Sequence, residues 1–195
     1  MKKSNSNNLK KNFYKIFLFH GVIKKNNYII RNYTKKHILE KNFIDKIKFL
    51  KKNYNILSLD EIYLNISNKV SLPPNTCAIT FDDGFENNYS VAAPILEKFK
   101  VPTTFYLSTD FINNNSMSWI DKIEYCFENT KSGCIQLPWK KNKINFFNKN
   151  DKILILDQIR NQIKKNFNIN IDKFVKTIFE QCNMVIPSSL DTELD

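Results

Sequence analysis

Glycine is scarce in this sequence, with 3 residues in a chain of 195. So little glycine disfavours the glycine-rich loops that hold phosphates and the all-β folds that are built on tight hairpins. Long apolar runs are also missing, and none approaches the ~20 residues that a membrane-spanning helix needs. The run from Ile16 to Phe19 is too short for the core of a signal peptide. We therefore expect a soluble, cytoplasmic chain.

Cysteine pairs of the C-x-x-C type are absent as well, so the four cysteines do not indicate a structural zinc site. Free cysteines fit a reducing compartment, although four could in principle pair. Cys77 lies in an apolar run, and we expect it to be buried.

The charge has one sign in excess, with a formal net charge of +11. This could indicate nucleic-acid binding. However, lysine and asparagine run together along the whole chain, and the basic residues form no single stripe. We favour a biased composition over a specific nucleic-acid partner.

The residues that are abundant indicate a globular protein, because 42% are hydrophobic and 13% are aromatic. Over the first 107 residues, apolar periods typical of strands alternate with periods typical of helices. Alternation of this kind predicts an α/β fold, with parallel strands joined by crossover helices. The expected strands are 14–19, 56–59, 77–81 and 103–107, and the expected helices are 38–54, 60–66 with Asp60 as N-cap, and 89–99.

The second half of the chain has a different character. We expect a helix over 118–127 with Ser118 as a cap, a small hairpin of 134–137 with 144–147, and amphipathic helices over 153–167 and 171–182. Residues 1–12 are polar and expected to be disordered. The predicted division is thus a tail of residues 1–12, an α/β part of residues 13–117, and an insertion of residues 118–195 with an acidic end.

The sharpest feature is the string from Thr80 to Gly84, in which Asp82 and Asp83 directly follow an apolar strand. In parallel α/β folds, functional groups gather at the carboxyl ends of the strands. One carboxylate can bind a divalent metal, and its neighbour can accept a proton from a metal-bound water. The alternative is an ordinary Asp-Asp-Gly turn at the end of a strand.

Several blocks around this string occur in a recognisable order. They are FHGV at 19–22, LSLDE at 57–61, AITFDDGFENNY at 78–89, APIL at 93–96 and VPTTFYL at 101–107. Together they resemble the polysaccharide deacetylase family, which carries the NodB-homology domain, over about residues 14–125.

The resemblance implies a partial, distorted, TIM-like (β/α) barrel, with residues 13–117 as its first part and the helical segment 118–195 inserted on it. It also implies a hydrolase of carbon–nitrogen bonds that removes acetyl groups from N-acetylated carbohydrate with a divalent metal, zinc being the expected ion. By the same resemblance, a cell-envelope or extracellular location is an alternative to the cytoplasm.

The family pattern implies that Asp82 is the general base and Asp83 a metal ligand. His20, at the end of the first strand, is a candidate to contact substrate and is not favoured as a ligand. The family's other ligands are histidines of an H-x-x-x-H motif, whereas this sequence has only His20 and His37, 17 positions apart. We therefore expect a chain that stops before the metal histidines. The alternative is an inactive fragment or a carbohydrate-binding pseudo-enzyme.

Two further features have alternative interpretations. Trp119, Asp121 and Glu124 share one predicted helix. They could form a surface on which a sugar stacks. We favour instead a packed tryptophan beside a solvated acidic edge. His37 precedes a helix in a polar stretch, and we expect it to be solvated.

Overall fold

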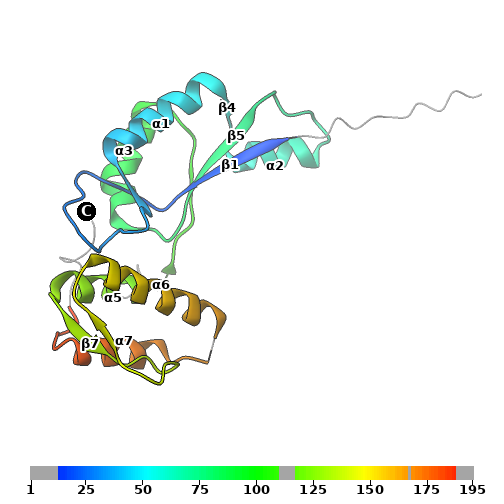
Figure 1. The fold of residues 1–195 in the computed structure, drawn as a ribbon. Coiled ribbons are helices and arrows are strands. Elements are labelled where there is room, and N and C mark those ends of the chain that lie inside the picture. Colours follow the sequence, from blue (N-terminus) through cyan, green and yellow to red (C-terminus); the bar gives the residue numbers. More distant parts are fainter. Residues whose placement is uncertain (1–12, 110–116, 167, 188–195) are drawn as a thin grey trace, which may run out of the picture. The chain divides into compact units, whose positions relative to one another are not determined.

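The computed structural model describes residues 13–109, 117–166 and 168–187. Contacts along the backbone divide the chain into two compact units, drawn together in Figure 1. The first unit consists of residues 1–22 and 39–107, and the second of residues 23–38 and 108–195. The tail 1–12 and the acidic end 188–195 lie outside the described residues, and the roles predicted for 13–117 and 118–195 stay predictions.

The first unit is built on a parallel sheet with β5 (Thr76–Phe81) at its centre. β1 (Tyr14–Phe19) pairs with β5 along its whole length. β4 (Asn55–Ile56) pairs with the start of β5, and β6 (Thr104–Phe105) with its end. Separately, β2 (Gly21–Ile23) and β3 (His37–Leu39) form a two-stranded sheet. The predicted α/β class is confirmed, and the described strands form an open sheet, so the barrel is partial.

Aromatic packing explains the central position of β5, whose six residues are all buried. The Phe81 ring stacks on Phe19 of β1 at 5.4 Å between centroids and on Phe105 of β6 at 5.1 Å. Phe43 of α1 (Glu40–Asn53) meets Phe81 edge-on at 5.7 Å. Offset and edge-on aromatic pairs of this kind add stabilisation beyond the area that they bury.

The crossover helices follow the predicted periodicity. α1 buries Phe43, Ile47 and Leu50 along one stripe. Between β5 and β6, a π-helical turn η1 (Asn88–Ala92) leads into α3 (Ala93–Lys98), so the predicted helix 89–99 starts with a wider turn. The strands predicted over 56–59 and 103–107 are wrong in length, because only two residues of each region pair with β5 as a strand.

The prediction that Asp60 caps the next helix is also wrong. α2 (Leu59–Ser67) begins after Ser58, whose hydroxyl accepts a hydrogen bond from the Glu61 N–H at 3.1 Å. The Glu61 carboxylate in turn accepts the Ser58 N–H at 2.7 Å, which completes a capping box. The Ser58 N–H and the Ser58 hydroxyl, which donate to the Glu61 carboxylate at 2.7 and 2.8 Å, hold the pKa of Glu61 below its ordinary value. Asp60 lies inside the first turn, where its charge only complements the helix dipole.

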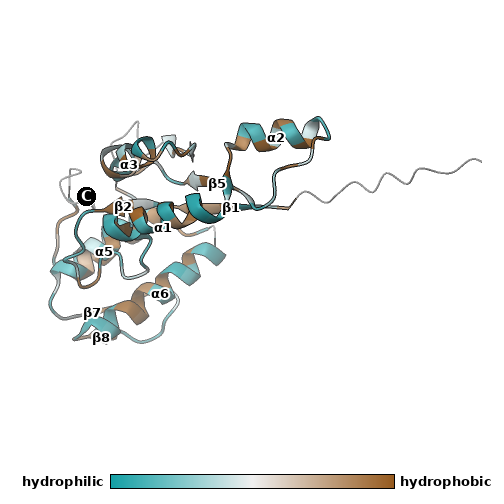
Figure 2. Cartoon of the chain, turned by 90° about the horizontal axis from the view of Figure 1, so that it is seen from above, coloured by the Kyte–Doolittle hydropathy of each residue, from teal (hydrophilic) through white to brown (hydrophobic). Residues whose placement is uncertain are grey.

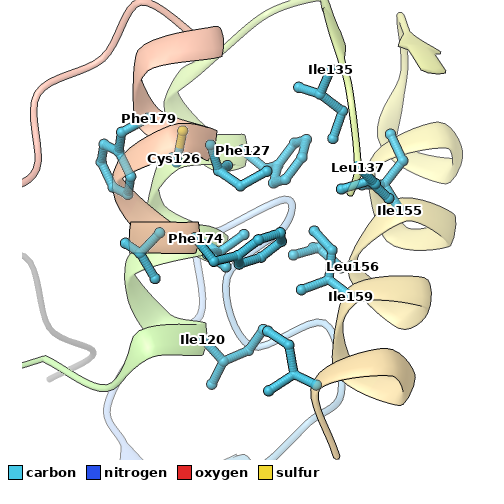
Figure 3. Packing of buried hydrophobic residues seen from close by; sticks show 14 of the residues in the cluster. Ile120, Cys126, Phe127, Ile135, Leu137, Ile155, Leu156, Ile159, Phe174 and Phe179 are labelled. Atoms are coloured by element: carbon cyan, nitrogen blue, oxygen red, sulfur yellow. The ribbon is translucent and has the colours of Figure 1, made fainter. Parts of the chain in front are cut away.

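The second unit contains the helices and hairpin predicted for the later part of the chain. They are α5 (Trp119–Asn129) with Ser118 as N-cap, β7 (Gly133–Ile135) paired antiparallel with β8 (Ile144–Phe146), α6 (Lys149–Lys165) and α7 (Ile171–Gln181). Their apolar faces share one buried cluster, part of which is drawn in Figure 3. Its fully buried large side chains include Phe127, Ile135, Leu137, Phe146 and Phe179.

The helices are amphipathic. Figure 2 shows α1 and α6 carrying both hydrophilic and hydrophobic colour, as expected of helices with one buried face. In the described parts of the chain, every helix is too short or too polar to span a bilayer. Cys77 on β5 is buried, as predicted.

The capping box of α2 gives a direct test of where this helix starts. Replacing Ser58 by Ala removes the hydroxyl acceptor and should lower the free energy of unfolding by about 1 kcal/mol. Asp60→Ala keeps the cap and should cost only a few tenths of a kcal/mol. Urea denaturation of both variants measures the difference, and a larger loss for Asp60→Ala would contradict the assignment of the cap.

Candidate active site

The aspartate pair lies at the carboxyl end of β5. Asp82 and Asp83 directly follow Phe81, and both are half-buried. The Asp82 N–H donates to the carbonyl of Phe19, the last residue of β1, at 3.0 Å, which continues the β1–β5 ladder one residue beyond β5. On the other side of β5, the Tyr106 N–H donates to the Phe81 carbonyl at 2.8 Å. Ladder bonds on both sides therefore hold the backbone that carries the pair.

The chain turns sharply directly after Asp82. Asp83 has φ +75° and Gly84 has φ +76°, so two successive residues adopt the left-handed conformation. Such a conformation is unusual for a residue with a Cβ and costs on the order of 1 kcal/mol. It persists because the turn packs closely: a Cβ built on Gly84 would lie 2.9 Å from Leu107 Cδ2.

His20 reaches the same edge of the sheet from β1. Because Phe19 pairs with Phe81 in register, His20 and Asp82 occupy the next positions on neighbouring parallel strands. His20 is half-buried. The structure thus brings together the three residues to which sequence reasoning assigned a base, a ligand and a substrate contact. Those three assignments stay predictions.

Asn87 is a residue of this region that sequence reasoning did not single out. Its side chain is buried, with 1% exposed, and its Oδ1 accepts the Val22 N–H at 3.2 Å. This bond ties the loop after Gly84 to the segment after His20, so that the two strand ends cannot move independently. The only signal in the sequence was its place inside the block 78–89.

A divalent metal can be tested against these donors. Carboxylates and imidazoles are suitable zinc ligands, and a catalytic zinc usually takes three protein ligands. Within the described residues, no three His, Cys, Asp or Glu side chains gather into a group that could hold an ion. Asp82, Asp83 and His20 therefore do not by themselves fit a complete zinc site.

The prediction that His37 is solvated is wrong. The residue is 3% exposed, and it lies in a reciprocal backbone contact with Asn32. The His37 N–H donates to Asn32 Oδ1 at 2.9 Å, and its carbonyl accepts from Asn32 Nδ2 at 2.8 Å. Two hydrogen bonds between the Asn32 side chain and the His37 backbone therefore order this polar stretch.

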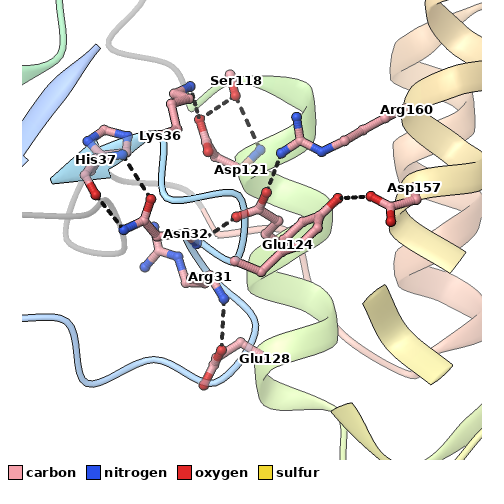
Figure 4. Close-up of polar contacts among 11 residues, drawn as sticks. Arg31, Asn32, Lys36, His37, Ser118, Asp121, Glu124, Glu128, Asp157 and Arg160 are labelled. Atoms are coloured by element: carbon pink, nitrogen blue, oxygen red, sulfur yellow. Dashed lines mark hydrogen bonds and ion pairs between the residues drawn. The ribbon is translucent and has the colours of Figure 1, made fainter. Parts of the chain in front are cut away.

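The acidic edge predicted on α5 is not solvated either. Asp121 is 8% exposed and Glu124 is 2% exposed. Glu124 pairs with Arg160 of α6 and accepts the Asn32 N–H at 2.9 Å, while Asp121 bonds the Ser118 hydroxyl (Figure 4). Trp119 packs partly buried against the core cluster. These carboxylates fix the second unit internally.

Glu128 of α5 also stabilises the second unit through hydrogen bonds. Its carboxylate accepts the N–H groups of Ile29, Ile30 and Arg31 at 3.1, 2.6 and 3.0 Å. Together with Glu124, it supplies the hydrogen-bond acceptors for a backbone stretch that has no strand partner of its own there. Acidic side chains on α5 therefore have a structural explanation, and the aspartates after β5 are the stronger candidates for chemistry.

The turn at Gly84 can be tested by adding a methyl group. Gly84→Ala places a Cβ in a left-handed residue and against Leu107, and should lower the free energy of unfolding by about 1–3 kcal/mol. Ser67→Ala, on the exposed end of α2, should change it by less than about 0.5 kcal/mol. Urea denaturation compares them, and an unchanged stability of Gly84→Ala would show that the turn is not tightly packed.

The buried Glu124 should make stability depend on pH. Burial, followed by the charge of Asp121, raises its pKa above the ordinary 4.5 and outweighs the opposing effect of Arg160. The folded state then binds a proton more readily, so this group's contribution to stability is lost as pH rises from 4.5 towards the raised pKa.

Glu124→Gln cannot titrate and should lack this dependence. The free energy of unfolding of the unmodified chain, minus that of the variant, should therefore decrease with pH across this window in urea titrations. Glu180→Gln, at an exposed position, serves as the control. A difference that stays flat or increases would contradict the assigned pKa shift.

Comparison with known proteins finds similarity over the segment that carries the aspartate pair. The family model for polysaccharide deacetylase matches residues 69–137. A curated relative, the poly-beta-1,6-N-acetyl-D-glucosamine N-deacetylase of Staphylococcus aureus strain MSSA476, is 27% identical over 160 residues, which cover 80% of this chain and 53% of the relative. The chain thus spans about half the length of the curated relatives it matches.

Solved structures with some likeness are also deacetylases. A de-N-acetylase from Aggregatibacter actinomycetemcomitans has a TM-score of 0.47 and 21% identity, covering 74% of this chain and 50% of that one. The Streptococcus pyogenes deacetylase PplD has a TM-score of 0.42 and 22% identity, covering 54% and 46%. On the sequence match, residues 69–137, which carry the aspartate pair at the end of β5, are similar to the polysaccharide deacetylase family.

Proposed function

We propose that this chain supplies the aspartate pair of a carbohydrate deacetylase, a hydrolase that cleaves the amide bond of an N-acetylated sugar. One observation carries the proposal. Two adjacent half-buried carboxylates stand at the carboxyl end of a central parallel strand, beside His20, within the segment that matches the family. The name of the matched relative suggests a polymer of N-acetylglucosamine as the substrate class.

The reaction requires water to add to the acetyl carbonyl carbon, after which the C–N bond breaks and acetate leaves the free amine. Asp82 is the proposed general base that takes a proton from the attacking water. Ladder bonds on both sides of β5 hold its backbone, so the carboxylate needs little reorganisation to act. The half-buried His20 is the proposed contact to the sugar, since an imidazole can donate to or accept from a hydroxyl group.

The left-handed turn gives Asp83 a separate task. We propose its carboxylate as one ligand of a divalent metal, with zinc as the preferred ion. Such an ion would polarise the acetyl carbonyl and lower the pKa of a bound water. The described residues do not complete a three-ligand site, and we propose that the remaining ligands come from residues outside them.

The incomplete ligand set favours a second candidate function. A carbohydrate-binding pseudo-enzyme would bind the sugar at the carboxyl edge of the sheet without hydrolysing its amide bond. Zinc binding distinguishes the two, because a deacetylase must hold an ion at Asp83, whereas a binding module need not.

Asp82→Asn tests the proposed base. A protein that includes this chain together with the remaining metal ligands, supplied with zinc, should release acetate from an N-acetylglucosamine oligomer. Its Asp82→Asn variant should release acetate at least ~100-fold more slowly, because the amide side chain cannot accept the proton. Asp45→Asn, at an exposed position on α1, should match the unmodified chain. Acetate is measured by a coupled enzymatic assay.

Two results would contradict the proposal. Equal acetate release by Asp82→Asn and the unmodified chain would exclude Asp82 as the base. Binding of the oligomer with no acetate release by the zinc-supplied protein that carries all the ligands would favour the carbohydrate-binding alternative.

A further inference from the structure

Three neighbouring strands end in a row at the carboxyl edge of the sheet in the first unit. β1 and β6 lie on the two sides of β5, and both pair with it in register as far as Phe81. His20, Asp82 and Tyr106 are the first residues beyond these paired positions on β1, β5 and β6. Asp82 therefore lies in the middle of the row, with His20 on one side and Tyr106 on the other.

Two hydrogen bonds beyond the paired residues keep this row regular. The Asp82 N–H donates to the Phe19 carbonyl at 3.0 Å, and the Tyr106 N–H donates to the Phe81 carbonyl at 2.8 Å. The ladder of the sheet thus reaches both Asp82 and Tyr106. The alternation of side chains between the two faces of the sheet continues to these residues for the same reason.

The aromatic residues before the row show which face it occupies. The ring of Phe81 stacks on those of Phe19 and Phe105, with centroids 5.4 and 5.1 Å away. Phe43 of α1 packs against the same ring, so these phenylalanines point towards the helix. Because successive residues of a strand point to opposite faces, the next residue on each strand extends on the face away from α1.

Tyr106 presents an open aromatic ring in this row. Its side chain is 53% exposed, while the sheet holds its backbone. A single exposed aromatic residue is ordinary on a protein surface, as Tyr63 of α2 illustrates. Tyr106 differs because it lies one strand away from a pair of carboxylates. Aromatic side chains combined with a few placed polar groups are typical of small-molecule sites.

The spacing of the row suits one sugar ring. Neighbouring strands lie ~4.8 Å apart, so the backbones at His20 and Tyr106 are separated by roughly 10 Å across β5. This span is comparable to one monosaccharide with its substituents. A sugar that lies against Tyr106 therefore has Asp82 within reach and His20 at its far side.

A pyranose ring and a tyrosine ring have complementary faces. The axial C–H groups on one face of a glucose-type sugar carry a slight positive charge, whereas the face of an aromatic ring is negative. Stacking also removes apolar surface of both rings from water. The contact needs a flat ring with one open face, and the phenol hydroxyl group is not required for it.

We propose that Tyr106 is a substrate-binding residue whose ring stacks against the N-acetylated sugar and holds the acetamido group near Asp82. The inference rests on the proposed function and adds the contact that positions the sugar ring. Stacking restricts the orientation of the amide bond relative to the general base, and correct orientation supplies a large part of a catalytic effect.

Binding of an N-acetylglucosamine oligomer to the full chain without metal, measured by isothermal titration calorimetry, tests the proposal. Tyr106→Ala should raise the dissociation constant at least about fivefold, because the stacking surface is lost. Tyr106→Phe keeps the ring and should stay within about twofold of the unmodified chain. Tyr63→Ala removes another exposed tyrosine and should leave the dissociation constant unchanged.

A second measurement uses the unmodified chain alone, so it does not depend on the folding of a variant. At saturating oligomer, nuclear Overhauser contacts should join the ring protons of Tyr106 to axial C–H protons of the sugar. The ring protons of Tyr63 should show no such contacts. Contacts from Tyr63 and none from Tyr106 would contradict the assigned surface.

Three results of the calorimetry would overturn the proposal. They are an unmodified chain that does not bind the oligomer, a Tyr106→Ala variant that binds as tightly as the unmodified chain, and a Tyr106→Phe variant that binds as weakly as Tyr106→Ala. The assay contains no metal and measures no hydrolysis. Failure of the Tyr106 contact and failure of acetate release are therefore separate results.

Discussion

The hydrogen bond from the Asp82 N–H to the Phe19 carbonyl is the contact on which the candidate site depends. It carries the parallel ladder of β1 and β5 one residue past the end of β5. Because parallel strands end at the same edge, this bond places His20 beside Asp82. The buried phenylalanines behind β5 keep the ladder in register, since a slip by one residue would turn Phe81 away from its aromatic neighbours. The buried core of the first unit thus determines how His20 and Asp82 are placed at the carboxyl edge of the sheet.

The carboxylates of the two units differ in what surrounds them. Glu124 and Glu128 accept backbone N–H groups, and Glu124 also pairs with an arginine, so their oxygens are already engaged in holding the second unit together. Asp82 and Asp83 are half-buried at the end of a strand, on a turn with strained backbone. The hydrogen-bond partners of a carboxylate therefore distinguish a structural role, as for Glu124 and Glu128, from a candidate chemical role, as for Asp82 and Asp83.

The sequence was sufficient to predict the features that depend only on residues close together in the chain. The alternation of strands and amphipathic helices, and the aspartates after β5, follow from periodicity and from one short string. The burial of His37 and Glu124 could not be predicted, because it depends on Asn32 and on a loop far away along the chain. The lengths of β4 and β6 depend on pairing with β5 and have no local signal. The cap at Ser58 was readable from Ser-x-x-Glu and was assigned to the wrong residue.

The central claim is that the aspartate pair attracts a cation at the edge of the sheet where β1 and β5 end and where His20 lies beside Asp82. Titration with Mn²⁺, followed through the backbone amide signals in nuclear magnetic resonance spectra, tests it most directly, because the ion broadens signals only from nearby residues. The account predicts that the amides of residues 20–22 and 82–84 broaden together at the lowest Mn²⁺ concentrations. Broadening of one group without the other, or broadening first around Asp121 and Glu124, would contradict it.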